Sequence, residues 1–277
     1  MLLAWNSPSL ADDHEVRWYD VEVVVFENLN VPRSDNTYWA VQAYVPELRG
    51  AISLGRDADS LANLGQSSAE IDESNELGGV SLAPRLLSES YHRLTAEAKT
   101  IARSSRYRLL VHQAWRQAGT PLDDAIPVQI VAGDPVPVFA PTNLEPQPAS
   151  DDLPQGLSVS NPLLTGANAE KAPVYTPPPV DGFRPVFTRP PGNQISNYKQ
   201  MLAHPLDGTI TVALGRYLHV YTNLALTRSR KGASGTALQS YIAKGHRRMR
   251  SRTLHYIDHP EIGVLVTITP YETDAES

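Results

Sequence analysis

The side chains of this sequence best suited to binding chemistry are basic and gather toward the C-terminus. Between Gly208 and Tyr256 there is no Asp or Glu, although the whole chain has 30 acidic residues. The basic residues of this span are Arg216, Arg228, Arg230, Lys231, Lys244, Arg247, Arg248, Arg250 and Arg252. Guanidinium groups pair with carboxylates through two parallel hydrogen bonds. The pattern predicts a surface for a carboxylate-bearing polymer or an acidic protein, with pairing inside the protein as the alternative.

We expect the binding surface to be centred on the last part of this span. Its predicted residues are Lys244, Arg247, Arg248, Arg250, Arg252, His255 and Tyr256. A nucleic acid is not the expected ligand, because the chain carries a formal net charge of −6. The basic cluster also lacks the interleaved aromatic residues that stack on bases.

A metal site near the C-terminus is the weaker of two interpretations of one short segment. His255, Asp258 and His259 can ligate Zn²⁺ if they share a helical turn. In an extended segment the Asp side chain points away from the two imidazoles, so a hydrogen-bonded turn is favoured. We therefore predict no metal and no cofactor.

Catalysis is not predicted either. Asp20 and Glu22 share one face of an expected strand at about 7 Å, within the range of an inverting glycosidase pair, but such pairs are common on strands. Nucleophile elbows, phosphate-binding loops, H-E-x-x-H and G-x-G-x-x-G motifs do not occur, and the chain has no cysteine.

The elements that must position these side chains follow from hydrophobic periodicity. Predicted strands span residues 18–27, 106–117, 209–227, 241–249 and 263–271. A 4-3-4-3 apolar spacing from Leu87 to Ile101 predicts a helix that Ser88 or Ser90 caps. The segment 209–227 would extend about 60 Å as one strand, so a bend or bulge is expected near Gly215 and Arg216.

The predicted fold class is α+β, a mostly antiparallel sheet with one main packed helix, interrupted by long loop insertions. The first strand is apolar on both faces, which indicates a central position in the sheet. The order along the chain of first strand, helix and second strand favours a right-handed crossover between the two strands. No apolar run is long enough for a membrane-spanning helix, so no integral membrane segment is expected.

The expected organisation is a single α+β domain over residues 16–277 after a signal-peptide remnant at 1–11. The remnant is indicated by a short apolar piece and a small-x-small triplet that precedes Asp12. Insertions are predicted at about 28–84, which is acidic and rich in Gly and Ser, and at 119–206. The second is Pro-rich, with 17 of the 23 prolines. It favours a stiff spacer with brief strands at 128–131 and 136–139.

Four segments together resemble the CsiV family. They are residues 18–27 (WYDVEVVVFE), 107–117 (YRLLVHQAWRQ), 215–226 (GRYLHVYTNLAL) and 247–270 (RRMRSRTLHYIDHPEIGVLVTITP). The resemblance implies a non-enzymatic periplasmic protein that binds peptidoglycan. It also implies a regulator that activates an outer-membrane lipoprotein cofactor of a bifunctional penicillin-binding protein. No ligand-contacting residue is carried over from the family.

Two other functions stay open at this point. One is a protein-interaction adaptor of the cell envelope that uses the Pro-rich segment and binds no glycan. The other, less favoured, is a carbohydrate- or metal-dependent hydrolase.

Overall fold

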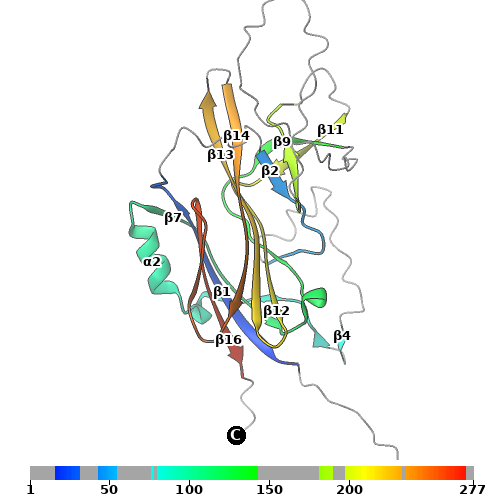
Figure 1. Ribbon diagram of the computed structural model, residues 1–277, viewed down its shortest axis with the longest axis vertical. Coiled ribbons are helices and arrows are strands. Elements are labelled where there is room, and N and C mark those ends of the chain that lie inside the picture. The colour runs from blue at the N-terminus through cyan, green and yellow to red at the C-terminus, as the bar shows by residue number, and fades with distance from the viewer. Residues whose placement is uncertain are drawn as a thin grey trace, which may run out of the picture.

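The computed structural model describes residues 16–31, 43–54, 76–77, 80–142, 181–189, 197–232 and 235–272. Two five-stranded, mostly antiparallel sheets pack face to face, and a helix covers the outer face of one of them (Figure 1). Over these residues no helix is long and apolar enough to cross a membrane. The prediction of a mostly antiparallel architecture with one main helix is confirmed, although the strands divide into two large sheets.

Sheet I contains the first and the last long strands of the chain. In order across the sheet it consists of β15 (His255–Asp258), β16 (Ile262–Tyr271), β1 (Trp18–Asn28), β7 (Tyr107–Ala118) and β6 (Arg85–Leu86). The central strand β1 places Val21, Val23 and Val25 toward the second sheet and Val24 toward the helix. The predicted central, doubly covered strand is therefore confirmed.

The predicted crossover between the first two long strands is wrong. Strands β1 and β7 are direct neighbours, but they run antiparallel. The helix α2 (Thr95–Arg103) is followed almost at once by β7, so it does not span the connection. The segment between β1 and α2 contains short strands of its own. It brings the chain back to the end of sheet I at which β1 begins.

Sheet II contains most of the acid-free span. Its order is β14 (Gly235–Met249), β13 (Leu218–Gly232), β12 (Leu206–Leu214), β8 (Val128–Gln129) and β3 (Ile52–Ser53), with only β3 and β8 parallel. The segment predicted as one bent strand is a hairpin of β12 and β13 whose turn lies at the predicted bend. Strands β13 and β14 have 15 residues each and extend beyond the other strands at one end (Figure 1).

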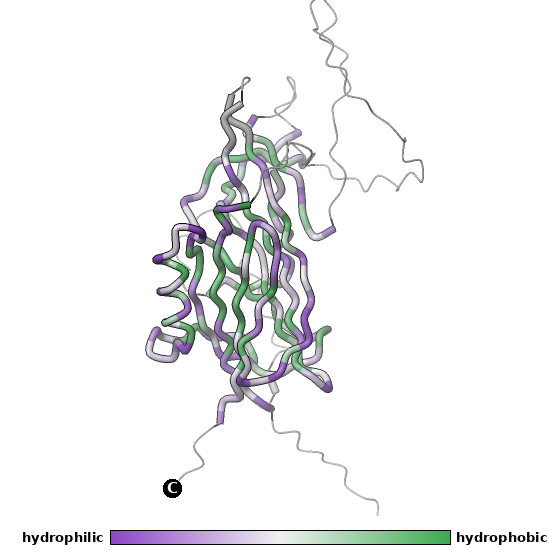
Figure 2. The backbone as a smooth tube through the Cα atoms, turned by 60° about the vertical axis from the view of Figure 1, so that its left-hand side comes forward, coloured by the Kyte–Doolittle hydropathy of each residue, from purple (hydrophilic) through white to green (hydrophobic). Residues whose placement is uncertain are grey.

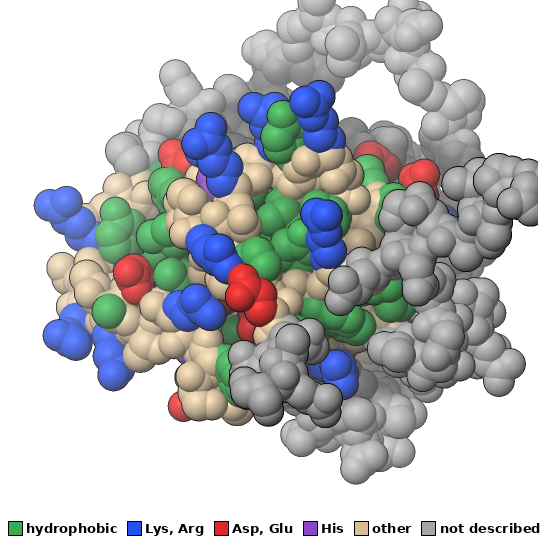
Figure 3. Space-filling view, turned by 90° about the horizontal axis from the view of Figure 1, so that it is seen from below, with side chains coloured by type: hydrophobic (Ala, Val, Ile, Leu, Met, Phe, Trp, Pro, Cys, Tyr) green, Lys and Arg blue, Asp and Glu red, His purple; other side chains and the backbone are tan. Residues whose placement is uncertain are grey.

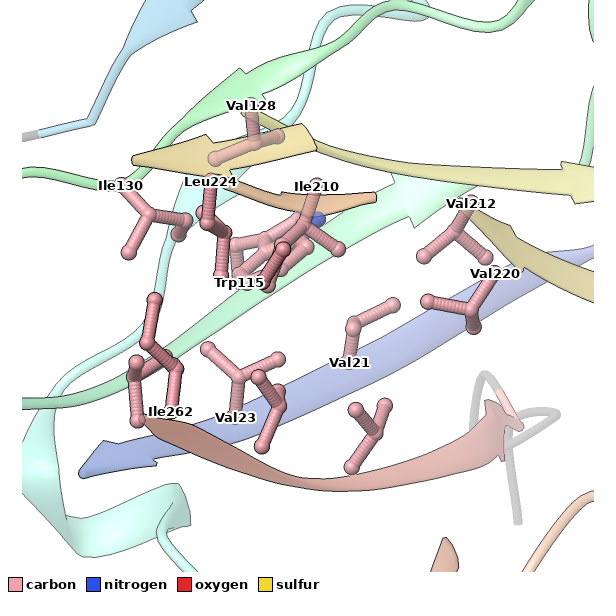
Figure 4. Close-up of a cluster of buried hydrophobic side chains, with 14 of the residues drawn as sticks. Val21, Val23, Trp115, Val128, Ile130, Ile210, Val212, Val220, Leu224 and Ile262 are labelled. Atoms are coloured by element: carbon pink, nitrogen blue, oxygen red, sulfur yellow. The ribbon is translucent and has the colours of Figure 1, made fainter. Parts of the chain in front are cut away.

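The core lies between the two sheets, where most inward-facing residues of the long strands are apolar. Figure 2 shows hydrophobic and hydrophilic residues alternating along these strands. Val21, Val23 and Trp115 of sheet I point toward Ile210, Val212 and Leu224 of sheet II (Figure 4). The Trp115 indole donates a hydrogen bond to Gln117 Oε1 (2.7 Å), and the Gln117 amide donates to the Val212 carbonyl (3.0 Å). The buried polar atoms of this pair are therefore satisfied, and they join the two sheets.

The helix begins later than its apolar spacing predicts. Leu94 is the N-cap of α2, whereas the segment before it forms only a single 3₁₀ turn, η2 (Glu89–Tyr91), and neither Ser88 nor Ser90 caps α2. The Glu22 carboxylate on β1 accepts the backbone N–H groups of Arg93 (2.7 Å) and Leu94 (2.8 Å). This contact from another element fixes the start of the helix, which local spacing cannot indicate.

Short strands from both predicted insertions form three further two-stranded sheets. They pair as β2 (Ala43–Pro46) with β10 (Phe183–Val186), β9 (Val136–Pro141) with β11 (Tyr198–Ala203), and β4 (Glu76–Leu77) with β5 (Val80–Ser81). Tyr44 and Phe183 pack on Ala225 of β13. The predicted signal-peptide remnant and the proline tracts at 177–179 and 190–191 lie outside the described residues and stay predictions.

Candidate ligand-binding face

The outer face of sheet II carries aromatic and basic side chains close to the β12–β13 turn. Every second residue of β13 points into the core, so His219 and Tyr221 point outward. The strand register places His246 opposite Tyr221 and Arg248 opposite His219. These four side chains therefore share one face on two neighbouring strands, and none of them is buried.

Three of these rings form a stack in which neighbouring ring planes are nearly parallel. The centroids of Tyr221 and His246 lie 4.4 Å apart with the planes 14° from parallel, and those of His219 and His246 lie 5.1 Å apart at 13°. The His219 Nδ1 and His246 Nε2 atoms are 2.9 Å apart, so one imidazole donates an N–H to the other. The hydrogen bond and the stacking hold the three rings in a fixed arrangement.

Guanidinium groups flank this surface on the side of the β12–β13 turn. Arg248 lies 4.7 Å from the centroid of the Tyr217 ring, which is 45% exposed, and Arg216 lies 5.7 Å from the same ring. Cation–π contacts of this kind orient the cations without neutralising them. Within the described ranges no carboxylate lies at salt-bridge distance from Arg216 or Arg248. Both cations therefore have the charge and the exposure to bind an anionic ligand.

Lys244 marks the other boundary of this surface. Its Nζ atom donates hydrogen bonds to the Asp181 carbonyl (2.9 Å) and carboxylate (3.0 Å). Beyond it, β2 and β10 cover the sheet. We call the surface between this boundary and the turn the aromatic–basic face, which comprises Arg216, Tyr217, His219, Tyr221, Lys244, His246 and Arg248.

The aromatic–basic face suits a ligand that has both an apolar face and carboxylates. Flat rings bury apolar surface at a low entropic cost because their side chains are already ordered. Guanidinium groups beside the rings pair with carboxylates in a fixed orientation. A saccharide with a pendant acidic group, or a short acidic peptide joined to a sugar, has this combination.

The structure separates the residues of the sequence-predicted surface. Lys244 and Arg248 lie on the aromatic–basic face, whereas Arg247 lies on the opposite side of β14, across from Val220, at the exposed edge of the sheet. Arg250 follows the end of β14, and its backbone N–H donates to His255 Nε2 (3.2 Å). The basic residues predicted to share one surface therefore lie on two different faces of β14.

The remaining predicted residues lie on or next to sheet I. Arg252 adopts a left-handed conformation (φ 59°) and pairs with Glu272. Tyr256 stacks on Phe26 at 6.2 Å, and its hydroxyl donates to Asp258 Oδ1 (2.6 Å). Burial, followed by this hydrogen bond, raises the pKa of Tyr256. These side chains lie apart from the stacked rings.

The stacked aromatic residues were missed by sequence reasoning. The apolar alternation of β13 predicts the core positions of this strand, and the residues between them include His219 and Tyr221. The outward-facing residues of β13 were therefore the signal in the sequence that could have indicated this site. It becomes specific only when the register with β14 is known, because His246 completes the stack from the neighbouring strand.

Basic side chains also occur at the adjacent end of the sandwich, where β1 begins and β16 ends. Arg85 lies 5.7 Å from the centroid of the Trp18 ring, and Arg116 lies 3.2 Å from that of Tyr271. Arg116 also pairs with Asp20 through hydrogen bonds of 2.6 and 3.0 Å. Figure 3, which views the molecule from this end, shows Lys and Arg side chains among hydrophobic ones.

The two carboxylates weighed as a catalytic pair have different partners. Asp20 is paired with Arg116, whereas Glu22 accepts hydrogen bonds from the start of α2 and lies 2.7 Å from His112 Nε2. Both groups therefore serve as acceptors within sheet I and its helix. This arrangement does not hold them ready on either side of a shared substrate.

His255 and Asp258 are the ends of strand β15, and His259 lies in the turn that follows it, so the three residues do not share a helical turn. His255 accepts from the Arg250 N–H, Asp258 accepts from the Tyr256 hydroxyl, and His259 Nδ1 accepts from the Glu261 N–H (3.2 Å). Burial lowers the pKa of His259. Each of the three side chains is thus engaged in a separate hydrogen bond.

A protein-family model described as "Peptidoglycan-binding protein, CsiV" matches residues 1–271 of the chain. No curated protein and no solved structure matches it. The matched range contains the strands of both sheets and the whole aromatic–basic face.

Proposed function

The chain belongs to the CsiV family of peptidoglycan-binding proteins, and we propose that it binds peptidoglycan through the aromatic–basic face. The observation that carries this proposal is the stack of Tyr221, His246 and His219 beside the guanidinium group of Arg248, which pairs with no carboxylate of the described part of the chain. The remaining residues of the sequence-predicted surface, from Arg250 to Tyr256, are proposed only as flanking contacts.

Peptidoglycan offers the two chemical groups that this face accommodates. Its glycan strands present sugar rings with apolar faces, and its stem peptides end in carboxylates. A charge-assisted pair between a guanidinium and a carboxylate contributes about 1.5–3 kcal/mol. Because the polymer repeats the same groups, several weak contacts along one strand add to the total binding strength.

We also propose that the protein acts in the periplasm as a regulator of cell-wall synthesis rather than as an enzyme. The proposed role is activation of an outer-membrane lipoprotein cofactor of a bifunctional penicillin-binding protein. Family membership supports an envelope location, where the polymer lies. The engagement of Asp20 and Glu22 in pairs within the protein supports a non-catalytic role.

Co-sedimentation with purified sacculi tests the binding site through two charge reversals on neighbouring residues. Arg248→Glu places a negative charge on the aromatic–basic face, whereas Arg247→Glu makes the same change on the opposite side of β14. We expect roughly tenfold weaker binding for Arg248→Glu and a small effect for the matched variant. Equal losses in both would indicate non-directional attraction, and native binding by Arg248→Glu would overturn the assignment of the face.

A further inference from the structure

A second group of side chains with ligand chemistry lies on the opposite side of the molecule, beneath the start of α2. Glu22 comes from β1, His92 from the segment before the helix and His112 from β7. One possible ligand atom from each residue lies within 4.8 Å of the others. We propose that these three residues bind a divalent transition-metal ion such as Zn²⁺.

The donor set matches the preferences of this ion. Zn²⁺ binds imidazole nitrogen and carboxylate oxygen at about 2.0–2.2 Å, and two histidines with one glutamate form one of its recurring three-residue sets. The fourth tetrahedral position is then left to a water molecule. The proposal concerns binding of the ion and includes no reaction.

Glu22 and His112 need to move little to admit the ion, whereas the ligand atom of His92, which lies within 4.8 Å of the other two, closes to about 3.3 Å from them. His112 Nε2 and Glu22 Oε1 are now 2.7 Å apart, joined by a hydrogen bond, and the rings of His92 and His112 lie 4.3 Å apart. Two ligand atoms on a tetrahedral Zn²⁺ lie about 3.3 Å apart, given its bond lengths. The ion therefore replaces the bridging proton, and the imidazole and carboxylate separate by less than 1 Å.

The carboxylate is held in place by contacts outside the ligand set. Glu22 is 3% exposed, and its two oxygens accept the N–H groups of Arg93 and Leu94. Hydrogen bonds of this type fix the orientation of a ligand and raise metal affinity. The site is thus preorganised by the same contact that begins the helix.

The electrostatics of the site combine opposing effects. The start of a helix disfavours a cation, whereas Glu22 and the nearby Glu89 each contribute a negative charge. The two negative charges therefore offset the unfavourable effect of the helix start on a cation.

Titration of the full chain with Zn²⁺ after chelator treatment tests the proposal by calorimetry. We expect one ion per chain and at least a tenfold loss of affinity in His92→Ala. The matched control is His246→Ala, because His219 and His246 form the other close imidazole pair among the described residues. Absence of binding in the native chain, an unchanged affinity in His92→Ala, or a loss in His246→Ala would each overturn the proposal.

Thermal unfolding gives a second readout on the same variants. An ion that binds only the folded state raises the melting temperature of the native chain, and this increase should vanish in His92→Ala. An equal increase in both proteins would contradict the assignment. His92→Ala should bind sacculi like the native chain, so the metal site and the peptidoglycan-binding face can fail independently.

Discussion

The Glu22 carboxylate accepts the backbone N–H of Leu94 at 2.8 Å, so a residue of the central strand determines where the helix begins. The same carboxylate accepts the N–H of Arg93 and pairs with His112. Its removal leaves three donors without their partner, two of them on the backbone. The strand, the helix and β7 are joined at this one group.

Glu22→Ala should lower the free energy of unfolding by about 3–5 kcal/mol, because buried donors lose a charged acceptor. Urea denaturation measures the effect. Glu22→Gln should lose less, since its amide oxygen still accepts one of the N–H groups. Glu89→Gln, which changes an exposed glutamate nearby, is the control and should remain within about 0.5 kcal/mol of the native chain. If the free energy of unfolding of Glu22→Ala changed as little as that of the control, the helix start would not depend on this contact.

Gly263 faces the ring of Phe26 across the β1–β16 pair. A Cβ atom at this position would overlap the ring, whereas a Cβ atom at Gly215 would have nothing within 4 Å. Gly263→Ala should therefore destabilise the fold by about 1–3 kcal/mol through overpacking, and Gly215→Ala should be near neutral. Thermal melts of the two variants compare the same chemical change in both sites. Similar melting temperatures would contradict the packing around Phe26.

Asp207 is buried, and its carboxylate accepts a hydrogen bond from Gln129 (2.9 Å). Burial raises the pKa of Asp207, despite opposing effects of the Gln129 hydrogen bond and His204. The folded state therefore holds the proton to higher pH than the unfolded state, and stability from this group falls as pH rises through the raised pKa. Asp207→Asn should stabilise the protein at pH 7.5 and lose this advantage near pH 4, as measured by urea unfolding. A stability difference independent of pH would contradict this sign.

Tyr221 tests whether ring stacking contributes to sacculus binding. Tyr221→Ala should weaken co-sedimentation about 2- to 10-fold, which corresponds to ~0.5–1.5 kcal/mol for an aromatic contact. Tyr221→Phe keeps the ring and should bind like the native chain. Equal weakening in both variants would assign the effect to the hydroxyl group instead of the ring face.

The long strands could be predicted from sequence because each has strong alternation and little competition from other patterns. This holds for β1, β7, β14 and β16, and for the position of the β12–β13 turn. The start of α2 could not be predicted, since the apolar spacing continues upstream and a carboxylate 72 residues earlier in the chain decides the boundary. The direction of β7 relative to β1 likewise depends on the path of the long connection.

The candidate site was partly predictable for a related reason. A run of arginines is visible in one strand, but the two sides of that strand belong to different surfaces. The ring stack depends on the β13–β14 register, and the proposed metal ligands depend on the meeting of three separate segments. Neither can be read from spacing along the chain.

The pairing of β1 with β16 joins residues 18–27 to residues 262–271, which lie close to opposite ends of the chain. Contacts between such distant segments slow folding, because a long loop must close before they form. A chain that is synthesised or exported from its N-terminus holds its apolar central strand without this neighbour until the last strand is released. During that interval Val21 to Val25 present an aggregation-prone edge. The order of strands in sheet I thus makes completion of the chain a condition for completion of the fold.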